Sequence, residues 1–374
     1  HNDHDIYKGL TFWSPNINIF RDPRWGRSEE CFGEDPYLAC RMGEAVVKAV
    51  QGEGVDVTAK HMCGQGETTG GVNASAARIG PHEMREIHLP PVKACVDAGV
   101  TSFMAAYNEI DGVYCHGNRW LLTDLLRNEY GFKGFVMSDG VAIDQLDAVT
   151  GDRTASGALA LNAGVDMGLW DTGFQQLEEA VAQGLVEEAA IDEAAKRILT
   201  VKFRRGLFEN PYVPETDEWQ SYTAENYPQV KDLAEQSVVL LKNEGGLLPL
   251  NVAEPLRLVM AGPNADAIYN QLGDYTPPIR KGVGSTPLHG MLDFIAKNEG
   301  EAELRFCRGC RGFAHDDLLL NQAVNLARES DVAIVVLGGT SSRFTKAEFD
   351  ANGALKRQDV ITMDCGENVD DAHI

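Results

Sequence analysis

Strand-like apolar runs alternate with helix-like segments through the first half of the chain, at intervals of roughly 30 to 45 residues. The strand-like runs are LTFWSPNINIF (10–20), VDVTAKH (55–61), VTSFMAAYN (100–108), GFVMSDG (134–140) and VDMGLW (165–170). The segments PYLACRMGEAVVKAVQ (36–51), with a proline near its first turn, and PHEMREIHLPPVKACVDAG (81–99) have helical character. This alternation is typical of βα units around a parallel sheet, so we expect an α/β fold.

A closed (β/α)₈ barrel needs eight strands and typically ~250 residues, and fewer strands than that can be read here. We therefore expect an incomplete barrel, or a barrel whose first strands precede His1. The alternation ends with IDEAAKRILTVKFRRG (191–206), where basic residues fill the last turn and Gly206 can end the helix. The predicted barrel domain spans 1–207.

A second α/β pattern begins near Lys231. The segment 208–230 is rich in proline, acidic and aromatic residues without periodicity, which favours a linker. After it, β-rich runs recur at SVVLLKN (237–243), LRLVMAGPNAD (256–266) and DVAIVVLGG (331–339). The chain of 374 residues is long enough for two domains, and we expect the second to span 231–374.

The charge balance excludes several classes of partner. Lys and Arg number 33 against 56 Asp and Glu, a formal charge of −23, which repels nucleic acid and anionic lipid. No apolar run approaches the ~20 residues of a membrane span. We expect a soluble protein with a neutral or cationic substrate, and the sequence leaves a homo-oligomer open. The expected location is cytoplasmic, with a secreted or periplasmic one open because a leader could precede His1.

The eight cysteines are scattered along the chain, which favours reduced thiols. Cys307 and Cys310 form a CxxC pair, but a zinc site would need a second pair of ligands at matching spacing. The residues His1, Asp3 and His4 could ligate a metal, although a segment without chemistry is the better interpretation. We therefore expect no metal and no organic cofactor.

Polar residues recur where the predicted strands end. Lys60 and His61 follow one apolar run, Tyr107 follows the next, and Asp139 ends the run GFVMSDG. In βα barrels the reactive groups lie at the carboxyl ends of the strands. Each residue also has a structural interpretation: Asp139 could cap a turn, Lys60 could lie on the surface, and His61 and Tyr107 could belong to the core. Their shared position favours a site.

The loop RDPRWGR adds a cluster of charges beside an aromatic ring. It contains Arg21, Arg24 and Arg27 together with Trp25. An arginine fork can bind carboxylates or sugar hydroxyls, and a tryptophan offers an apolar face to a sugar ring. One loop cannot direct all of these side chains at one ligand, so most of them must be structural.

Several longer motifs resemble glycoside hydrolase family 3. They are NINIFRDPRWGRSEECFGEDPYL, AKH, GPHEMREIHLPPVKACVDAGVTSFMAAYNEIDGV, LLTDLLRNEYGFKGFVMSDG and SVVLLKNEGGLLPL, in the family's order and across nearly the whole chain. The resemblance implies a (β/α)₈-type barrel followed by an α/β sandwich, each incomplete in this chain, with the active site between them. It also implies a β-linked oligosaccharide or glycoside as substrate, cleaved from the non-reducing end with retention.

The resemblance also implies roles for individual residues. Asp139, in MSDG, falls on the catalytic nucleophile. Arg27, Lys60 and His61 fall on positions that bind hydroxyls of the sugar, and Tyr107 falls on the tyrosine beside the nucleophile. The glucosidases of the family often have an aromatic residue, commonly tryptophan, directly after the nucleophile. This chain has Gly140 at that position, which leaves room for a different pocket wall.

The acid/base implied by the resemblance is Glu367, in CGENVDD, which partly matches the family's E-G-x-D-R pattern; Glu348, in TKAEFD, is the alternative. Retaining hydrolysis needs two carboxyl groups ~5–5.5 Å apart, one ionised and one protonated.

We expect a β-glucosidase, with a β-xylosidase of the same family as the alternative. Two other classes stay open: an aldolase-like enzyme with a Schiff base on Lys60, and a non-catalytic carbohydrate-binding homologue.

Overall fold

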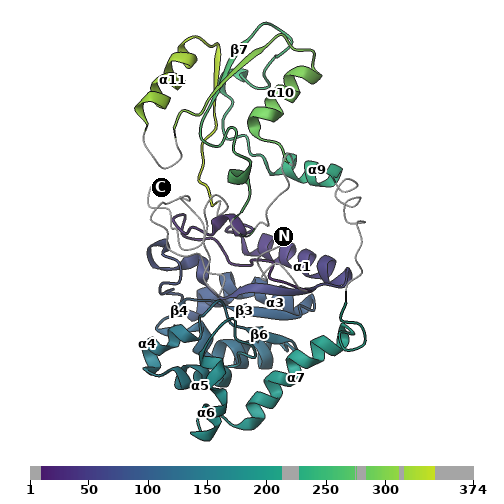
Figure 1. Ribbon diagram of the computed structural model, residues 1–374, viewed down its shortest axis with the longest axis vertical. Helices are drawn as coiled ribbons and strands as arrows, with labels where there is room; N and C mark the ends of the chain where they lie inside the picture. Colours follow the sequence, from purple (N-terminus) through teal and green to yellow (C-terminus); the bar gives the residue numbers. More distant parts are fainter. Residues whose placement is uncertain (1–9, 213–226, 274, 276–283, 311–315, 342–374) are drawn as a thin grey trace.

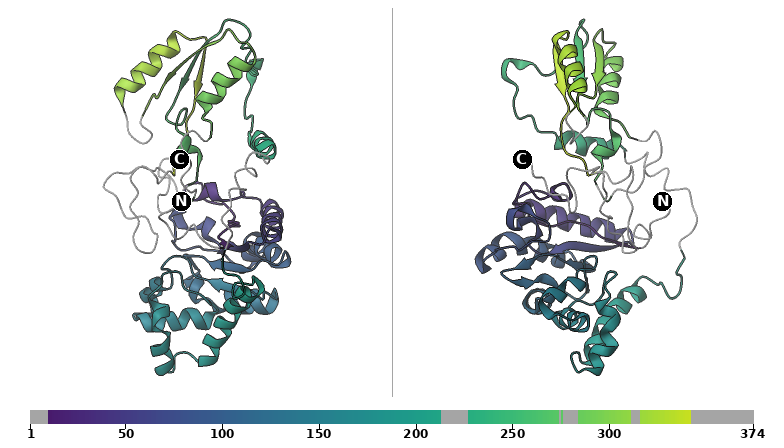
Figure 2. Two further views of the ribbon diagram at one scale, coloured as in Figure 1. Left: turned by 45° about the vertical axis from the view of Figure 1, so that its right-hand side comes forward. Right: turned by 60° about the vertical axis from the view of Figure 1, so that its left-hand side comes forward.

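The computed structural model describes residues 10–212, 227–273, 275, 284–310 and 316–341. These residues form two bodies that follow one another along the long axis of the molecule (Figure 1). The first body holds the elements up to residue 212, and the second holds the remaining elements. The same separation is visible from two other directions (Figure 2).

The first body is built on a parallel sheet. Strands β1 (Thr11–Phe12), β2 (Asp56–Met62), β3 (Ser102–Ala105) and β6 (Phe135–Met137) pair in the order β1-β2-β3-β6. All three pairings are parallel, so the carboxyl ends of the four strands lie at the same edge. Every residue of β2, β3 and β6 is buried, as expected for strands covered on both faces.

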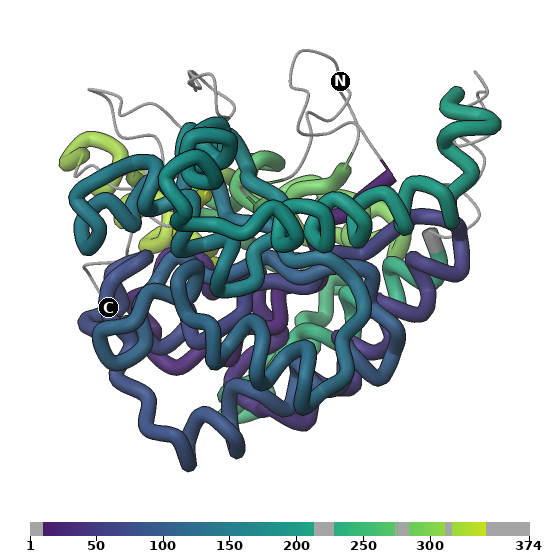
Figure 3. The backbone as a smooth tube through the Cα atoms, turned by 90° about the horizontal axis from the view of Figure 1, so that it is seen from below, coloured from purple at the N-terminus to yellow at the C-terminus, as the bar shows by residue number. Residues whose placement is uncertain are grey.

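Helices cover this sheet as the sequence predicts. The longer ones are α1 (Pro36–Gly52), α3 (Leu89–Asp97), α5 (Arg153–Ala163) and α7 (Glu188–Arg204). Helix α7 runs across the end of the molecule that Figure 3 shows. Shorter helices are α2 (Pro81–Glu83), α4 (Asp147–Thr150) and α6 (Leu177–Ala182), and π-helical turns occur at η5 (Met84–His88) and η7 (Trp120–Glu129).

Helix α1 illustrates how local sequence sets this packing. The Asp35 side chain accepts a hydrogen bond from the Tyr37 backbone at 2.8 Å, and Pro36 occupies the first turn. Losing such a cap costs ~1 kcal/mol. Gly43 faces α3, where an added Cβ would lie 3.1 Å from the sulfur of Cys95. The glycine therefore allows α1 and α3 to approach closely.

The second body is a smaller parallel sheet with flanking helices. Strands β7 (Arg257–Ala261), β8 (Glu303–Cys307) and β9 (Val332–Val335) pair in the order β8-β7-β9. Helices α9 (Tyr227–Ser237), α10 (Pro287–Lys297) and α11 (Asp317–Arg328) belong to the same body. The predicted strands at 256–266 and 331–339 are therefore confirmed in part of their length.

Other predicted strands are wrong or shorter than expected. SVVLLKN (237–243) contains no strand, and the run 165–170 pairs with β6 only through an isolated bridge between Met137 and Met167. The described strands of the first body form an open sheet, and they do not confirm a closed barrel or the sandwich. The boundary between the two domains stays a prediction.

Candidate active site

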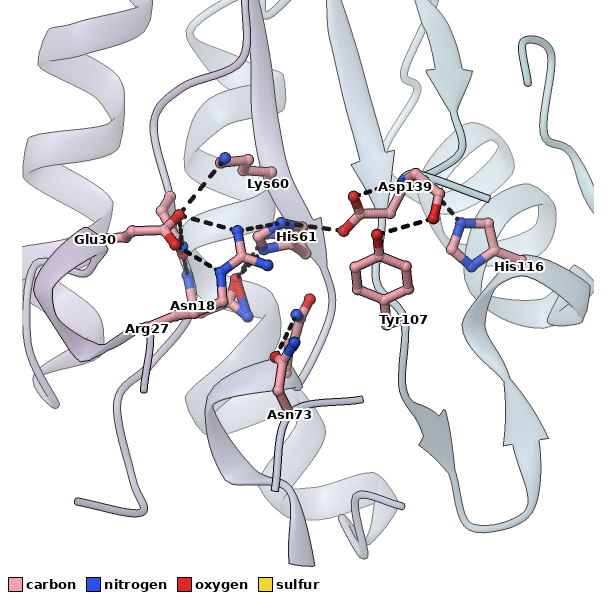
Figure 4. A network of polar contacts seen from close by, with 12 residues as sticks. Asn18, Arg27, Glu30, Lys60, His61, Asn73, Tyr107, His116 and Asp139 are labelled. Carbon is pink, nitrogen blue, oxygen red and sulfur yellow. Dashed lines mark hydrogen bonds and ion pairs between the residues drawn. The ribbon is translucent and has the colours of Figure 1, made fainter. Parts of the chain in front are cut away.

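Lys60 and His61 reach the carboxyl edge of the sheet from β2. Consecutive residues of a regular strand point to opposite faces. Here the pairing of β2 with β3 shifts between Lys60 and Met62, and such a bulge can redirect a side chain. Both side chains consequently join one polar network (Figure 4), where Lys60 is 8% and His61 is 1% exposed.

A largely buried carboxylate, Glu30, binds both cations of this network. Arg27 donates to it from Nε at 2.6 Å and from Nη2 at 3.0 Å, and the Lys60 ammonium lies 3.5 Å from Oε2. Burial alone would raise the pKa of Glu30, but Arg27 and Lys60 outweigh it and lower the pKa to about 2. Glu30 is therefore ionised at neutral pH and partly offsets the two positive charges.

His61 is neutral, and its contacts define its tautomer. Burial, followed by the charges of Arg27 and Lys60, lowers its pKa well below the ordinary value. Arg27 lies 3.3 Å from Nε2, and because a guanidinium can only donate, Nε2 must accept. The other nitrogen, Nδ1, then donates to Oδ1 of Asn18 at 3.1 Å, and the same oxygen accepts the His61 backbone N–H at 2.7 Å.

Asp139 lies just beyond β6, and its two carboxylate oxygens have different environments. Oδ1 accepts the Gly140 backbone N–H at 2.8 Å. Oδ2 is buried without a hydrogen-bond donor and lies 3.4 Å from Nε2 of His61. This contact is no ion pair, since His61 is neutral and its Nε2 carries no proton. Oδ1 therefore makes the turn-capping contact that the sequence also allowed, whereas Oδ2 is available to a ligand.

The charge on Asp139 is balanced between burial and its neighbours. Burial raises its pKa above the ordinary value, and the positive charges of Arg27 and Lys60 oppose that rise. The Gly140 N–H and the Tyr107 hydroxyl lower the pKa further toward its ordinary value. Asp139 is thus a largely buried carboxyl group without a direct ion pair.

Two neutral groups fix the backbone around Asp139. The Asp139 N–H donates to Nε2 of His116 at 3.0 Å, and burial lowers the pKa of His116 to about 3. The Tyr107 hydroxyl donates to the carbonyl oxygen of Gly140 at 2.9 Å. Figure 4 shows His116 on the side of Asp139 opposite Glu30 and Tyr107 below Asp139.

A second buried carboxylate, Asp171, braces the same turn from the neighbouring loop. Its Oδ2 accepts the Ser138 hydroxyl at 2.5 Å and the Leu169 N–H at 2.8 Å, and its Oδ1 accepts the Ile143 N–H at 2.8 Å. Burial raises its pKa, and these hydrogen bonds oppose the rise. The turn that carries Asp139 is therefore fixed on both sides, which limits the motion of the Asp139 side chain.

The second body contributes one aromatic ring to the cluster. The ring of Tyr275 lies 4.7 Å from the Lys60 ammonium and 5.7 Å from the Arg27 guanidinium carbon. Cation–π contacts of this kind add ~0.5–2 kcal/mol. A hydrogen bond of 2.8 Å from the Ser341 hydroxyl to Glu29 also joins the two bodies.

Five of the predicted site residues fall together: Arg27, Lys60, His61, Tyr107 and Asp139 belong to one network. Glu367 and its alternative Glu348 lie outside the described residues. Sequence reasoning missed further residues that complete the network, namely Asn18, Glu30, His116, Asp171 and Tyr275. Only Asn18 and Glu30 lay within a motif that had been singled out, the arginine-rich run that begins NINIF.

The arrangement can bind a neutral polyol and present a carboxylate to it. Arg27, Lys60 and Asn18 offer donors for hydroxyl groups, and Asp139 offers the free oxygen Oδ2. The described residues contain no group of three His, Cys, Asp or Glu side chains that could hold a metal ion. Within those same residues, no helix has the length and apolar character to cross a membrane.

A cavity of about 540 Å³ lies at the opposite, amino-terminal end of the strands. Its lining includes Asp56 at the start of β2, Thr101 before β3 and Gly134 before β6. This cavity contains none of the residues of the network. The volume of a cavity alone therefore does not identify the candidate active site, whereas a cluster of buried charged side chains indicates it.

Comparisons with known proteins give the chain its family. Residues 6–201 match the Glycosyl hydrolase family 3 N terminal domain, and residues 238–373 match the Glycosyl hydrolase family 3 C-terminal domain. A β-xylosidase of Formosa agariphila is 35% identical over 92% of this chain and 51% of its own length. A periplasmic β-glucosidase of Salmonella typhimurium is 31% identical over 94% of this chain and 50% of its own length.

Solved structures agree with these matches. A β-glucosidase of Erythrobacter marinus has a TM-score of 0.79 and 33% identity, covering 93% of this chain and 50% of its own. A β-glucosidase of Listeria innocua in complex with isofagomine has a TM-score of 0.80 and 26% identity, covering 89% and 47%. The chain spans about half the length of the relatives it matches. It belongs to glycoside hydrolase family 3, as its motifs predict.

Proposed function

We propose that the enzyme containing this chain is a retaining, exo-acting β-glycosidase that removes terminal non-reducing β-D-glucosyl residues. The observation that carries the proposal is the unpartnered Oδ2 of Asp139, which is buried beside Arg27, Lys60 and His61. A carboxylate oxygen without a donor is free to attack carbon. The relatives named β-glucosidase and β-xylosidase support the reaction class.

In the proposed mechanism, Oδ2 of Asp139 attacks the anomeric carbon of the bound sugar. The bond to the leaving oxygen breaks as Glu367 gives that oxygen a proton, and a covalent glycosyl ester forms on Asp139. Glu367 then takes a proton from water, the water oxygen attacks the same carbon, and the ester bond breaks. Two inversions retain the β configuration. Arg27, Lys60 and His61 hold sugar hydroxyls throughout.

The preference for glucose over xylose is the finer part of the proposal. The two sugars differ by one hydroxymethyl group, which is worth ~1–3 kcal/mol at most in a fitted site. The relatives include enzymes named for each sugar, so the xylosidase alternative has equal support from them. Direct comparison of the two aryl glycosides decides between them. The cellular compartment stays a prediction as well.

The contacts of Lys60 favour a binding role over Schiff-base chemistry. Its ammonium group faces the Glu30 carboxylate and the ring of Tyr275. Trapping with borohydride in the presence of a carbonyl substrate would support the aldolase-like alternative instead. A non-catalytic homologue would bind sugar without turnover.

The test uses the enzyme of full natural length with 4-nitrophenyl β-D-glucoside and 4-nitrophenyl β-D-xyloside. Asp139→Ala should abolish turnover of both, and full activity of this variant would refute the mechanism. Glu367→Ala should be inactive alone and should form a β-glycosyl azide when azide is added. An active Glu367→Ala variant would remove only the acid/base assignment, and Glu348→Ala would then be the next variant to measure.

A further inference from the structure

Gly140, the residue after Asp139, leaves space that a neighbouring ring fills. A Cβ added to Gly140 would lie 3.2 Å from the Tyr107 hydroxyl oxygen. It would also lie 3.7 Å and 3.8 Å from two carbons of the Trp170 indole, which is ordinary van der Waals contact. The indole of Trp170 therefore stands directly beside the turn that carries Asp139, where a side chain on residue 140 would otherwise project.

The backbone holds Trp170 in this place at an energetic cost. Its φ is +61°, a region that residues other than glycine rarely adopt, and such strain costs ~1–3 kcal/mol. Both flanking residues are tied to the Asp139 turn. The carbonyl of Leu169 accepts the Val141 N–H at 2.9 Å, and the carboxylate of Asp171 accepts the Ser138 hydroxyl. These bonds fix the strained residue between them.

The ring itself remains accessible. Trp170 is 40% exposed, although it lies next to a carboxylate that is only 8% exposed. Trp13, at the end of β1, packs against it with ring centroids 6.4 Å apart and an interplanar angle of 78°. Single exposed apolar residues are common on protein surfaces and usually need no explanation. A strained tryptophan that is supported by a second tryptophan beside a buried carboxylate is a different case.

The exposure of these groups indicates which part of a substrate would meet this ring. Lys60, at the end of β2, and Asp139 are each 8% exposed, whereas Trp170 is 40% exposed. Trp170 follows the segment that bridges to β6 at Met167 and also packs against Trp13 beyond β1, so it lies at the exposed margin of the same cluster. A sugar ring held at the buried groups, with its anomeric carbon at Asp139, would direct its leaving group outward, to the level of Trp170.

We propose that Trp170 is a specificity-determining residue that packs against the leaving group, an aromatic or pyranose ring, of the glycoside. This inference rests on the proposed function and deepens it. An indole face offers such a ring a large, rigid apolar surface. A small alkyl leaving group would bury little of that surface and would gain little from it.

The test compares kcat/KM for 4-nitrophenyl and methyl β-glycosides of the sugar that the full-length wild type prefers. The truncating variant is Trp170→Gly, because glycine adopts positive φ without strain and the loop should keep its conformation. It should lower kcat/KM for the nitrophenyl substrate about tenfold and change the value for the methyl glycoside less than about twofold. Trp170→Phe should stay within about threefold of the wild type on both substrates.

Trp120 provides a matched control, since it is 42% exposed and belongs to another element, the helical segment η7. Trp120→Ala should leave both values unchanged, and near-ultraviolet circular dichroism checks that each variant is folded. An equal loss on the two substrates, or no loss on the nitrophenyl substrate, would overturn the role of Trp170. If the wild type hydrolyses neither substrate, the proposed function itself fails.

Discussion

The ion pairs of Glu30 make a quantitative prediction about stability. Glu30→Gln keeps the shape of the side chain but removes the charge that binds Arg27 and Lys60. At 3.5 Å and an effective dielectric of ~20, a single pair such as Lys60–Glu30 has a Coulomb energy of about 5 kcal/mol before desolvation is counted. Breaking a buried pair by removing one partner costs ~3–5 kcal/mol.

The pKa of Glu30 gives a similar figure independently. A folded value of about 2, against an ordinary 4.5, corresponds to about 3 kcal/mol of unfolding free energy. Because the folded pKa is lowered, this contribution is fully present above pH 4.5 and is lost as the pH falls toward 2. Glu30→Gln should therefore be about 3 kcal/mol less stable at pH 7, and the gap should shrink to roughly half at pH 3.

Urea unfolding of the wild type and Glu30→Gln across this pH range measures the gap. Glu44 offers a control, since it also binds an arginine and a lysine, Arg41 at 2.7 Å and Lys48 at 2.6 Å, but on an exposed helix surface. Glu44→Gln should change stability little, because exposed pairs contribute little. A Glu30→Gln variant as stable as Glu44→Gln at pH 7, or a gap that does not narrow in acid, would refute the reasoning.

Three further predictions concern the turn that carries Asp139. Lys60→Met removes a cation that opposes the rise in the pKa of Asp139 caused by burial. The acidic limb of the pH profile of kcat/KM should therefore move to higher pH, and a limb that does not move would contradict this. His116→Leu leaves the Asp139 N–H without a hydrogen-bond acceptor. Because a buried donor without an acceptor costs ~1–3 kcal/mol, the Asp139 turn should shift and kcat should fall about 10- to 100-fold. His116→Gln should recover part of that loss, whereas equal kcat in the two variants would exclude a positioning role. Asp171→Asn should lower the free energy of unfolding, measured by calorimetry, by ~1–3 kcal/mol. The control Asp152→Asn, at the exposed start of α5, should lower it less, because asparagine caps a helix as well as aspartate does.

Local sequence was sufficient where local physics decides the structure. The proline and the apolar spacing of 36–51 predict α1, and the structure places that helix at Pro36–Gly52. The strand ends that carry Lys60, Tyr107 and Asp139 were also predicted to meet, because parallel strands present their carboxyl ends at one edge. Both predictions depend only on periodicity and on the direction of the strands.

Features that depend on distant partners could not be predicted in the same way. SVVLLKN (237–243) has strong β propensity, but a strand exists only where another strand pairs with it. Glu30 stands in SEECFGED, which reads as an exposed acidic turn, and its burial follows from contacts with Lys60, which is 30 positions away. Gly140 was predicted to leave room for a different wall, and Trp170, from another loop, occupies that space; the sequence did not indicate which residue would do so.

The division of roles among the charged groups fits the nucleophilic role proposed for Asp139. Arg27 and Lys60 form their direct ion pairs with Glu30, and only their field reaches Asp139. A direct guanidinium–carboxylate pair would occupy Oδ2 and hold its lone pairs in strong hydrogen bonds. Nε2 of the neutral His61 lies 3.4 Å from Oδ2 and carries no proton to donate to it. The cations therefore favour the ionised carboxylate without covering Oδ2, the oxygen that attacks in the proposed mechanism.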